Sequence, residues 1–408
     1  MTEDVILTIG LLLVAGLAAR VIADLVGLPD IVLLIAFGAL LGPSVLDVVD
    51  VPLDSLGAQL LFTLGVSSIL FFGGLSLSLT VLRKVALTLG LLAIPGVILT
   101  AVVTGAVATL AFGLPFKQGL LIGAVLSPTD PAILIPLFVA SKVRVRLAQT
   151  VIAESAFNDP TGAVLALAVA GALMSGEGGI GGPAGEFLVE LGISSVVGIL
   201  AGVLLSATIS STRTGILRDS APIAVLAVVA TSYVSLDFAG GSGYLGAFLA
   251  GLIVGNMELL GLAMHSHHED ELKMWSGNLA DVVTIFVFLV VGAALPFGTL
   301  ADHWASSLAV VAVLLLIARP VAVLACTLPD RRARWTRREL AFLCWTRETG
   351  VVPAALVGVL AGLGVPHIDL LAGVVALAIV ATLLLQATPA PWLARRLGLL
   401  DPAPNPPG

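Results

Sequence analysis

The chain has 408 residues, of which 58% are hydrophobic and only 11% are charged, with a formal net charge of −7. An ordinary soluble domain is about 25% charged, so this composition excludes a soluble protein of this size. The few cations are not interleaved with aromatic residues, which excludes a nucleic-acid-binding protein. Apolar runs of about 20 residues recur along the chain without the alternation of β-barrel strands. The composition therefore predicts an all-α polytopic membrane protein.

Window lengths predict about thirteen transmembrane helices. The N-terminal stretch MTEDVILTIG lacks the basic region of a signal peptide, so we expect the first apolar run to be a retained helix. The segments lie near 5–24, 29–43, 58–80, 85–111, 118–139, 148–173, 187–210, 220–238, 241–260, 279–298, 305–327, 338–362 and 368–388. One transmembrane domain over residues 1–400 is predicted, followed by a disordered proline-rich tail at 401–408.

The distribution of basic residues predicts the orientation. With the N-terminus outside and thirteen alternating segments, sixteen of the nineteen Lys and Arg residues lie inside and only Lys117 lies outside. Basic residues accumulate in cytoplasmic loops, so this imbalance supports the number of segments. We expect an integral protein of a prokaryotic plasma membrane, with the N-terminus outside and the C-terminus in the cytoplasm.

Six ionisable residues lie in the middle half of the predicted spans. Each costs about 2.5–3.5 kcal/mol on insertion scales, and charges at this depth usually serve a function. A structural cluster of ion pairs is the alternative, but buried pairs are a poor source of stability. The six residues are Asp130, Glu154, Asp159, Arg319, Arg347 and Glu348.

Two spans contain signals for an interrupted helix. The fifth contains SPTDPAILIP, with prolines at 128, 131 and 136, and the twelfth contains TRETGVVP, with Gly350 and Pro353. Proline removes a backbone donor and clashes one turn back, so both helices should unwind near the midplane and cross there. Both breaks fall in the fifth helix of a six-helix unit. This predicts two inverted repeats, at about 5–173 and 220–388, joined by a linker helix at 187–210, as in secondary transporters.

The segment ESAFNDP at 154–160 supplies a candidate ion site. Ser155 and Asp159 are four residues apart and share one helical face, near the broken SPTDP stretch. Carboxylate, hydroxyl and carbonyl oxygens suit a hard cation, so Asp159 and Ser155, with carbonyl oxygens freed at the nearby break, are predicted ligands of a monovalent cation. A buried carboxyl group can hold a proton or a cation, but not readily both. That competition indicates exchange chemistry.

Glu154 has a different predicted role. It lies about one turn nearer the cytoplasm than Asp159, and the eleventh span can present Arg319 as a partner. We expect an ion pair between Glu154 and Arg319 that holds the sixth and eleventh helices together. Removal of one partner would leave a buried charge, at a cost of about 3–5 kcal/mol.

These motifs resemble the monovalent cation–proton antiporter superfamily, in its NhaP-type sodium/proton exchanger branch. Further similarity comes from GLPDIVLLIAFGALLGP near the N-terminus and FFGGLSLSLTVLR at 71–83, and it extends over about 5–390. The residues that carry the resemblance are Thr129, Asp130 and Pro131, then Glu154, Ser155, Asn158 and Asp159, and finally Arg319 and Pro320.

The resemblance implies a homodimer in the lipid membrane, with a dimerisation domain and a mobile core of six helices. It implies elevator-like alternating access, with Asp159 as the shared carrier of cation and proton. Thr129, Asp130, Ser155 and Asn158 would complete or support the site, and Pro131 and Arg347 are supporting residues. The Asn158–Asp159 form is associated in the family with electroneutral one-for-one exchange. No cofactor and no enzymatic activity are expected.

The chain departs from the family pattern at two places. Many relatives carry an acid where this chain has Phe72, so the choice between Na⁺ and K⁺ stays open, with Li⁺ as a further candidate. The arginine of the twelfth span is often followed by glycine, whereas here Glu348 and Thr349 separate Arg347 from Gly350. Glu348 would either neutralise Arg347 or face a water-filled funnel.

Alternative functions and minor signals complete the prediction. A cation channel or an ion-coupled symporter could use the same midplane site, and an intramembrane enzyme would need a histidine beside Ser155 that the spans lack.

Cys326 and Cys344 are interpreted as small hydrophobic residues rather than as a disulfide or metal pair. The stretch MHSHHEDE at 264–271, with His265, His267 and His268, is predicted to be a cytoplasmic polar loop and is a weaker candidate for a pH sensor.

Overall fold

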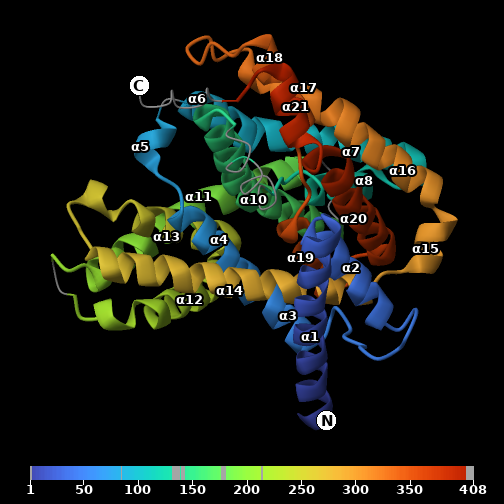
Figure 1. Ribbon diagram of the computed structural model, residues 1–408, viewed down its shortest axis with the longest axis horizontal. Coiled ribbons are helices and arrows are strands. Elements are labelled where there is room, and N and C mark those ends of the chain that lie inside the picture. Colours follow the sequence, from blue (N-terminus) through green and yellow to red (C-terminus); the bar gives the residue numbers. More distant parts are fainter. Residues whose placement is uncertain are drawn as a thin grey trace.

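A computed structural model describes residues 2–83, 85–130, 138, 143–175, 181–212 and 215–400. All regular elements in the described part of the chain are helices (Figure 1). Pro131 and the tail at 401–408 lie outside the described residues. The helices of the first half are α1 (Thr2–Val26), α2 (Asp30–Leu41), α3 (Leu56–Leu60), α4 (Val66–Leu75), α5 (Leu79–Leu82), α6 (Ala86–Leu91), α7 (Val97–Phe112), α8 (Phe116–Val125) and α10 (Val145–Met174).

The second half of the chain is also helical. Its helices are α11 (Gly181–Ile209), α12 (Ala221–Ala239), α13 (Gly243–Gly255), α14 (Ser266–Ala293), α15 (Phe297–Asp302), α16 (Trp304–Val313), α17 (Arg319–Thr327), α18 (Arg337–Trp345), α19 (Val351–Gly362), α20 (Ile368–Thr382) and α21 (Ala390–Leu397). Short 3₁₀ turns lie at Arg218–Ser220 and Met257–Leu260.

Nine helical segments within the described residues are long and apolar enough to cross a membrane, so the chain is an integral membrane protein. Four shorter apolar helices accompany them, namely α2, α8, α13 and α19. Every predicted span overlaps one of these thirteen segments. The predicted fold class, an all-α polytopic membrane protein, agrees with this architecture.

One prediction was wrong. The polar stretch at 264–271 was expected to be a loop, but α14 begins at Ser266 and includes most of it. The cause is that α14 is amphipathic at its start. Its charged first turns continue the same helix that becomes apolar further along the chain, so low hydropathy there does not mean the absence of a helix.

Glycines allow the helices to pack closely. A Cβ at Gly251 of α13 would lie 2.0 Å from the carbonyl oxygen of Phe71 in α4, and a Cβ at Gly38 of α2 would lie 2.2 Å from that of Leu289 in α14. Small residues at such contacts let backbones approach each other, which is the usual way that membrane helices associate. Figure 1 shows α11, α12 and α13 on one side of the molecule, and α7, α8, α16 and α20 on the other.

Four π-helical turns interrupt the long helices. They lie at Leu61–Gly65, Leu92–Gly96, Leu314–Ala318 and Leu383–Ala387. The second joins α6 to α7, and the third joins α16 to α17 and ends directly before Arg319. The turn at Leu92–Gly96 packs against α17, and the turn at Leu314–Ala318 packs against α7. Because π turns are frequent at functional sites, this pair directs attention to the residues beside Arg319.

Candidate functional site

Two interrupted segments meet in the middle of the protein. Helix α8 ends at Val125, and residues 127–130 continue without regular structure. A second gap, at 346–350, separates α18 from α19. The segments lie side by side, because the backbone N–H of Asp130 donates to the carbonyl oxygen of Glu348 at 3.1 Å. Irregular backbone at membrane depth requires such internal partners.

Each interrupted segment places a charged side chain at a helix end next to the other interruption: Asp130 at the N-terminus of α19, and Arg347 at the C-terminus of α8. The Asp130 carboxylate accepts a hydrogen bond from the backbone N–H of Val351, the first residue of α19, at 3.1 Å. The guanidinium of Arg347 donates to the carbonyl oxygens of Leu126 and, at 3.2 Å, of Pro128, at the end of α8. A negative charge at a helix N-terminus and a positive charge at a C-terminus both offset the helix dipole. The two charges therefore stabilise the interruption.

The side chains of α10 hold this crossing in place. Asn158 accepts a hydrogen bond from the backbone N–H of Thr129 at 3.0 Å and donates to the Thr129 hydroxyl at 2.8 Å. The Ser155 hydroxyl donates to the Thr129 carbonyl oxygen. All three side chains are buried. Thr129 is thus bound at its N–H, carbonyl and hydroxyl groups by two residues of the ESAFNDP segment.

Asp159 lies one residue beyond Asn158 in α10. One of its carboxylate oxygens, Oδ1, is buried and has no hydrogen-bond partner in the described part of the chain. Buried polar atoms are nearly always hydrogen-bonded, so such an atom needs an explanation. The predicted cation- and proton-binding residues are brought together at the crossing, namely Thr129, Asp130, Ser155, Asn158 and Asp159. The predicted supporting residue Pro131 lies outside the described residues.

Glu154 lies on a different face of α10 from Asp159 and forms an ion pair with Arg319 of α17. Both carboxylate oxygens bind the guanidinium, Oε2 at 3.0 Å from Nη2, and both side chains are at least 96% buried. Arg319 also donates to the carbonyl oxygens of Leu343 and Thr346, at 3.0 Å each. The bidentate geometry is the strongest form of this contact. Arg319 therefore joins α10 to the end of α18, where the second interruption begins.

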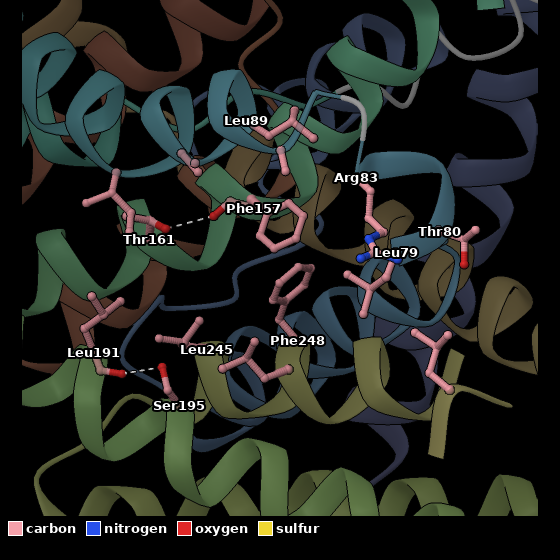
Figure 2. Close-up of a pocket in the computed structure, with 16 residues that line it drawn as sticks. Leu79, Thr80, Arg83, Leu89, Phe157, Thr161, Leu191, Ser195, Leu245 and Phe248 are labelled. Atoms are coloured by element: carbon pink, nitrogen blue, oxygen red, sulfur yellow. Dashed lines mark hydrogen bonds between the residues drawn. The ribbon is translucent and has the colours of Figure 1, made fainter. Parts of the chain in front are cut away.

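A wide cavity of about 620 Å³ approaches this site from one side (Figure 2). Its walls are mostly apolar, and Arg83 is the one charged side chain among the described residues that line it. Phe157 of α10 and Phe248 of α13 face each other there, with ring centroids 5.1 Å apart in an edge-to-face arrangement. Asp159 does not line the cavity, although Phe157 and Thr161 on either side of it do. The aromatic pair therefore forms part of the cavity wall, with Phe157 two residues along α10 from Asp159.

Several features of the site were not predicted from the sequence. Neither the Phe157–Phe248 contact nor the three hydrogen-bonding groups of Thr129 had a signal in the pattern. Gly350 was noted only as a helix breaker. Phe72, which replaces a common acid, lies beside α14, where its ring approaches Gly277. Glu348 is buried, so a position facing a water-filled funnel does not describe it.

The histidines near the start of α14 lie apart from the crossing. His268 has ring nitrogens 3.9 Å from a carboxylate oxygen of Asp219 and 3.7 Å from one of Glu271. Within the described residues, no group of three or more His, Cys, Asp or Glu side chains is arranged to hold a metal ion. These histidines contribute nothing to the site at the crossing.

The architecture defines a class of protein. Two interrupted helices that cross around buried charges, beside a cavity that stops short of them, are the design of a secondary transporter. The family model for the transmembrane sodium/hydrogen exchanger matches residues 9–396. The chain belongs to the sodium/hydrogen exchanger family, in agreement with the resemblance of its motifs. It is therefore a cation/proton antiporter and not an enzyme.

Individual relatives agree with this assignment. The chain is 29% identical over 399 residues to a K⁺/H⁺ antiporter, NhaP, of Alkalimonas amylolytica, covering 97% of this chain and 67% of that protein. It is 29% identical over 363 residues to a probable Na⁺/H⁺ antiporter of Methanocaldococcus jannaschii, covering 85% of this chain and 82% of the relative. The chain thus spans about two thirds of the length of the bacterial relative.

A solved structure has the same fold. The sodium proton antiporter MjNhaP1 of M. jannaschii, determined at pH 8, superimposes with a TM-score of 0.82. The match covers 97% of this chain and 99% of that chain, at 24% sequence identity. This likeness shows that the chain has an NhaP1-like fold.

Proposed function

We propose that the chain exchanges a monovalent cation for H⁺, with Asp159 as the shared carrier. Na⁺ and K⁺ are the main candidates for the cation, and Li⁺ is a further one. The observation that carries this proposal is the buried Asp159 Oδ1, which accepts no hydrogen bond from the described residues. A carboxylate oxygen in this position can accept a cation or take up a proton. Because one group serves both ligands, occupation by one displaces the other.

The neighbours of Asp159 support a cation as the second ligand. Ser155 lies on the same helical face, and the hydroxyl and carbonyl oxygens of Thr129 lie against Ser155 and Asn158. These are hard oxygen donors of the kind that alkali cations prefer. In the proposed cycle, Asp159, Ser155 and Thr129 bind the cation, while Asn158 and Asp130 position the segment that carries Thr129.

The charge balance supports a one-for-one exchange. Glu154 is neutralised by Arg319 and Asp130 sits at a helix N-terminus, so both have structural partners. Of these three acids, Asp159 is then the one whose carboxyl group is proposed to change its ligand. A single carrier that takes up one proton or one monovalent cation moves equal charge in both directions. The exchange is therefore proposed to be electroneutral.

The arrangement of the breaks supports alternating access. We propose thirteen membrane spans with the N-terminus outside, two inverted repeats at 5–173 and 220–388, and the helix at 187–210 as their connection. The paired π turns beside α7 and α17 fall in the fourth helix of each repeat, as the two interruptions fall in the fifth. An elevator motion would carry α10 and the crossing past α13. A channel would need a continuous pore past the site, whereas Asp159 does not line the wide cavity.

A homodimer is proposed as well. Family resemblance is its basis, and α1 offers an exposed apolar surface, where Leu7 is 62% and Val14 66% exposed. Cross-linking of a Val14→Cys variant that lacks Cys326 and Cys344 tests whether two copies of α1 meet in a dimer. Cross-linked dimers in native membranes are expected, and monomers alone would argue against the dimer.

Proton flux in proteoliposomes tests the exchange. Protein is reconstituted with an internal pH dye, and gradients of Na⁺, Li⁺, K⁺ or choline are imposed in turn. Proton movement driven by a small cation, and lost in Asp159→Asn, is expected. Asp302→Asn, at an exposed position of α15, is the matched control and should transport normally. Robust exchange by a folded Asp159→Asn protein would defeat the carrier assignment.

The same assay identifies the ion and the stoichiometry. The two relatives named above are described as K⁺/H⁺ and Na⁺/H⁺ antiporters, so they do not decide between the ions. The cation that drives the largest flux identifies the substrate. Clamping the membrane potential with a potassium ionophore, in a sodium or lithium gradient, should leave the rate unchanged if exchange is electroneutral. A rate that follows the potential would overturn that stoichiometry.

A further inference from the structure

A dense group of exposed arginines surrounds the start of α18. Five of them lie within eight residues, at positions 331, 332, 334, 337 and 338, and all five are exposed. Arg395 and Arg396 of α21 are exposed too. These seven residues are called the arginine patch here. They make up seven of the nineteen Lys and Arg residues of a chain whose net charge is −7.

The two parts of the arginine patch form one surface. Helices α18 and α21 pack against each other and lie side by side near the C-terminal end of the chain (Figure 1). In the described part of the chain, no carboxylate forms an ion pair with any of the seven arginines. No carboxylate of the described residues therefore neutralises the positive charge of this surface.

Buried hydrogen bonds hold the loop of the arginine patch in shape. The Asp330 carboxylate accepts from the hydroxyl of Thr88 at 2.7 Å, from the Thr88 backbone N–H at 3.2 Å and from the backbone N–H of Ala333 at 3.2 Å. The indole N–H of Trp335 donates to the Thr88 hydroxyl at 3.1 Å. The arginines thus project from a loop that is anchored to α6, which gives them a fixed spacing.

A second set of contacts ties the same loop to α10. Thr336 and Glu339 form a reciprocal capping box at the start of α18. Arg146, in the first turn of α10, stacks on the Trp335 ring at 4.2 Å and lies 3.6 Å from a Glu339 carboxylate oxygen. The helix that carries Asp159 therefore begins against the loop of the arginine patch.

The arginine patch lies at the height where a bilayer ends. The apolar segment Trp304–Thr327 is long enough to cross a membrane, and the arginines begin four residues after it. Leu328, between them, is 64% exposed, and Trp392 of α21 is 56% exposed. Exposed tryptophan is typical of the boundary between hydrocarbon and headgroups. The guanidinium groups are thus at headgroup level rather than in open solvent.

We propose that the arginine patch is a binding site for the phosphate groups of anionic phospholipids in the adjacent leaflet. Guanidinium groups bind phosphate oxygens in a bidentate manner, and a fixed loop loses little freedom when they do so. A nucleic acid or a soluble phosphate would not need the flanking Leu328 and Trp392.

Spin-labelled lipids test the proposal on the reconstituted, full-length chain. The fraction of motionally restricted lipid at the protein is compared for phosphatidylglycerol and phosphatidylcholine labels. The patch variant is Arg331→Gln/Arg337→Gln. The control variant Arg218→Gln/Lys273→Gln removes the same charge from residues outside the arginine patch, which already have Asp219 and Glu269 as partners.

The wild-type protein and the control variant should select phosphatidylglycerol several-fold over phosphatidylcholine, and the patch variant should lose most of this selection. Selection by the wild-type protein should also fall as salt is added, because exposed charges are screened. Equal selection by the wild-type and patch variant proteins, or selection that is insensitive to salt, would overturn the proposal. Displacement of labelled phosphatidylglycerol by millimolar inorganic phosphate would assign the site to a soluble phosphate compound instead.

Discussion

Gly350 lies directly against the carboxyl group of Asp130. A Cβ at position 350 would lie 1.9 Å from Asp130 Oδ2 and 2.3 Å from its Cγ. Only a residue without a side chain allows the two interrupted segments to come this close. The same contact places Asp130 at the first N–H group of α19. The position of one charge in the site is therefore set by the absence of a side chain on the neighbouring segment.

Gly350→Ala should abolish or strongly reduce transport in a protein that still inserts into the membrane. The added methyl group must displace Asp130 or separate the two segments, because the new Cβ would overlap the Asp130 carboxyl group. Proton flux in proteoliposomes measures the effect. Gly298→Ala, in α15, adds the same group where nothing lies within 4 Å of the new Cβ and should behave as the wild-type protein. Normal exchange by Gly350→Ala would contradict this account.

Glu154→Ala should destabilise the protein more than Asp159→Asn does. Loss of Glu154 leaves the Arg319 guanidinium buried without its carboxylate partner, at a cost of about 3–5 kcal/mol. Asp159→Asn keeps the size of the side chain, and Asp159 Oδ1 has no hydrogen-bond partner among the described residues. Thermal unfolding in detergent, followed by intrinsic fluorescence, compares the two variants. Equal melting temperatures for Glu154→Ala and the wild-type protein would remove the structural role of Glu154.

Asn158→Ala should impair transport through the position of Thr129. The substitution leaves the buried Thr129 N–H without its acceptor, which costs about 1–3 kcal/mol, and frees the Thr129 hydroxyl. The apparent affinity for the cation should fall more than the maximal rate, because Thr129 oxygens are proposed cation ligands. Cation titrations of the exchange rate measure both. Ser68→Ala is the control, since its hydroxyl bonds only the Leu64 carbonyl oxygen of its own helix.

The sequence predicted much of this arrangement because its signals are strong in a membrane. A charge or a proline inside an apolar run has few explanations there, so Glu154, Asp159, Arg319 and the two breaks could be recognised. Contacts between distant segments could not be predicted in the same way. Nothing in the pattern indicates that Arg347 reaches the end of α8, or that Asn158 binds Thr129 twice, because both depend on how the crossing segments pack.

Helix boundaries outside the bilayer were the least predictable feature. Hydropathy locates the apolar part of a helix, but α14 extends beyond it through Ser266 and the following charged residues. The π turns left no signal either. Three of the four contain ordinary leucine-rich sequence, and only the turn at Leu92–Gly96 contains a proline.

The Asp330 carboxylate should make stability depend on pH at the acidic end. Burial alone would raise its pKa, but hydrogen bonds from Thr88 and from the Ala333 backbone outweigh burial and lower the pKa. A group with a lowered folded-state pKa stabilises fully above its unfolded value of about 3.9 and loses this effect as the pH falls through the folded value. Asp330→Asn should therefore lower the free energy of unfolding at pH 7 by about 1.5–3 kcal/mol. Its melting temperature should be lower than that of the wild-type protein.

The difference between Asp330→Asn and the wild-type protein should shrink as the pH is lowered below about 4, because the wild-type carboxyl group becomes protonated. Melting curves between pH 3 and pH 8, in one detergent and at constant ionic strength, measure it. Asp50→Asn, at an exposed loop position outside the helices, is the control and should show no such trend. A stability difference that is constant over the whole range would show that Asp330 acts through its shape and not through its charge.

The aromatic pair Phe157–Phe248 should separate Asp159 from the wide cavity. Phe157 belongs to α10 and Phe248 to α13, so the proposed elevator motion of α10 past α13 would break the contact. Phe248→Ala removes one ring and should open a path toward Asp159. In a variant without Cys326 and Cys344, a cysteine at position 159 should react slowly with a membrane-impermeant thiol reagent, and faster once Phe248→Ala is added.

A cysteine at Thr161 supplies the comparison, since this residue already lines the cavity and should react rapidly with or without Phe248. Phe248→Leu keeps an apolar side chain but loses the edge-to-face contact, and should give an intermediate rate. Unchanged labelling at position 159 in Phe248→Ala would mean that other residues close the route. Faster labelling at both positions would indicate a general loosening of the packing between α10 and α13, so only a change confined to position 159 supports a gate at this pair.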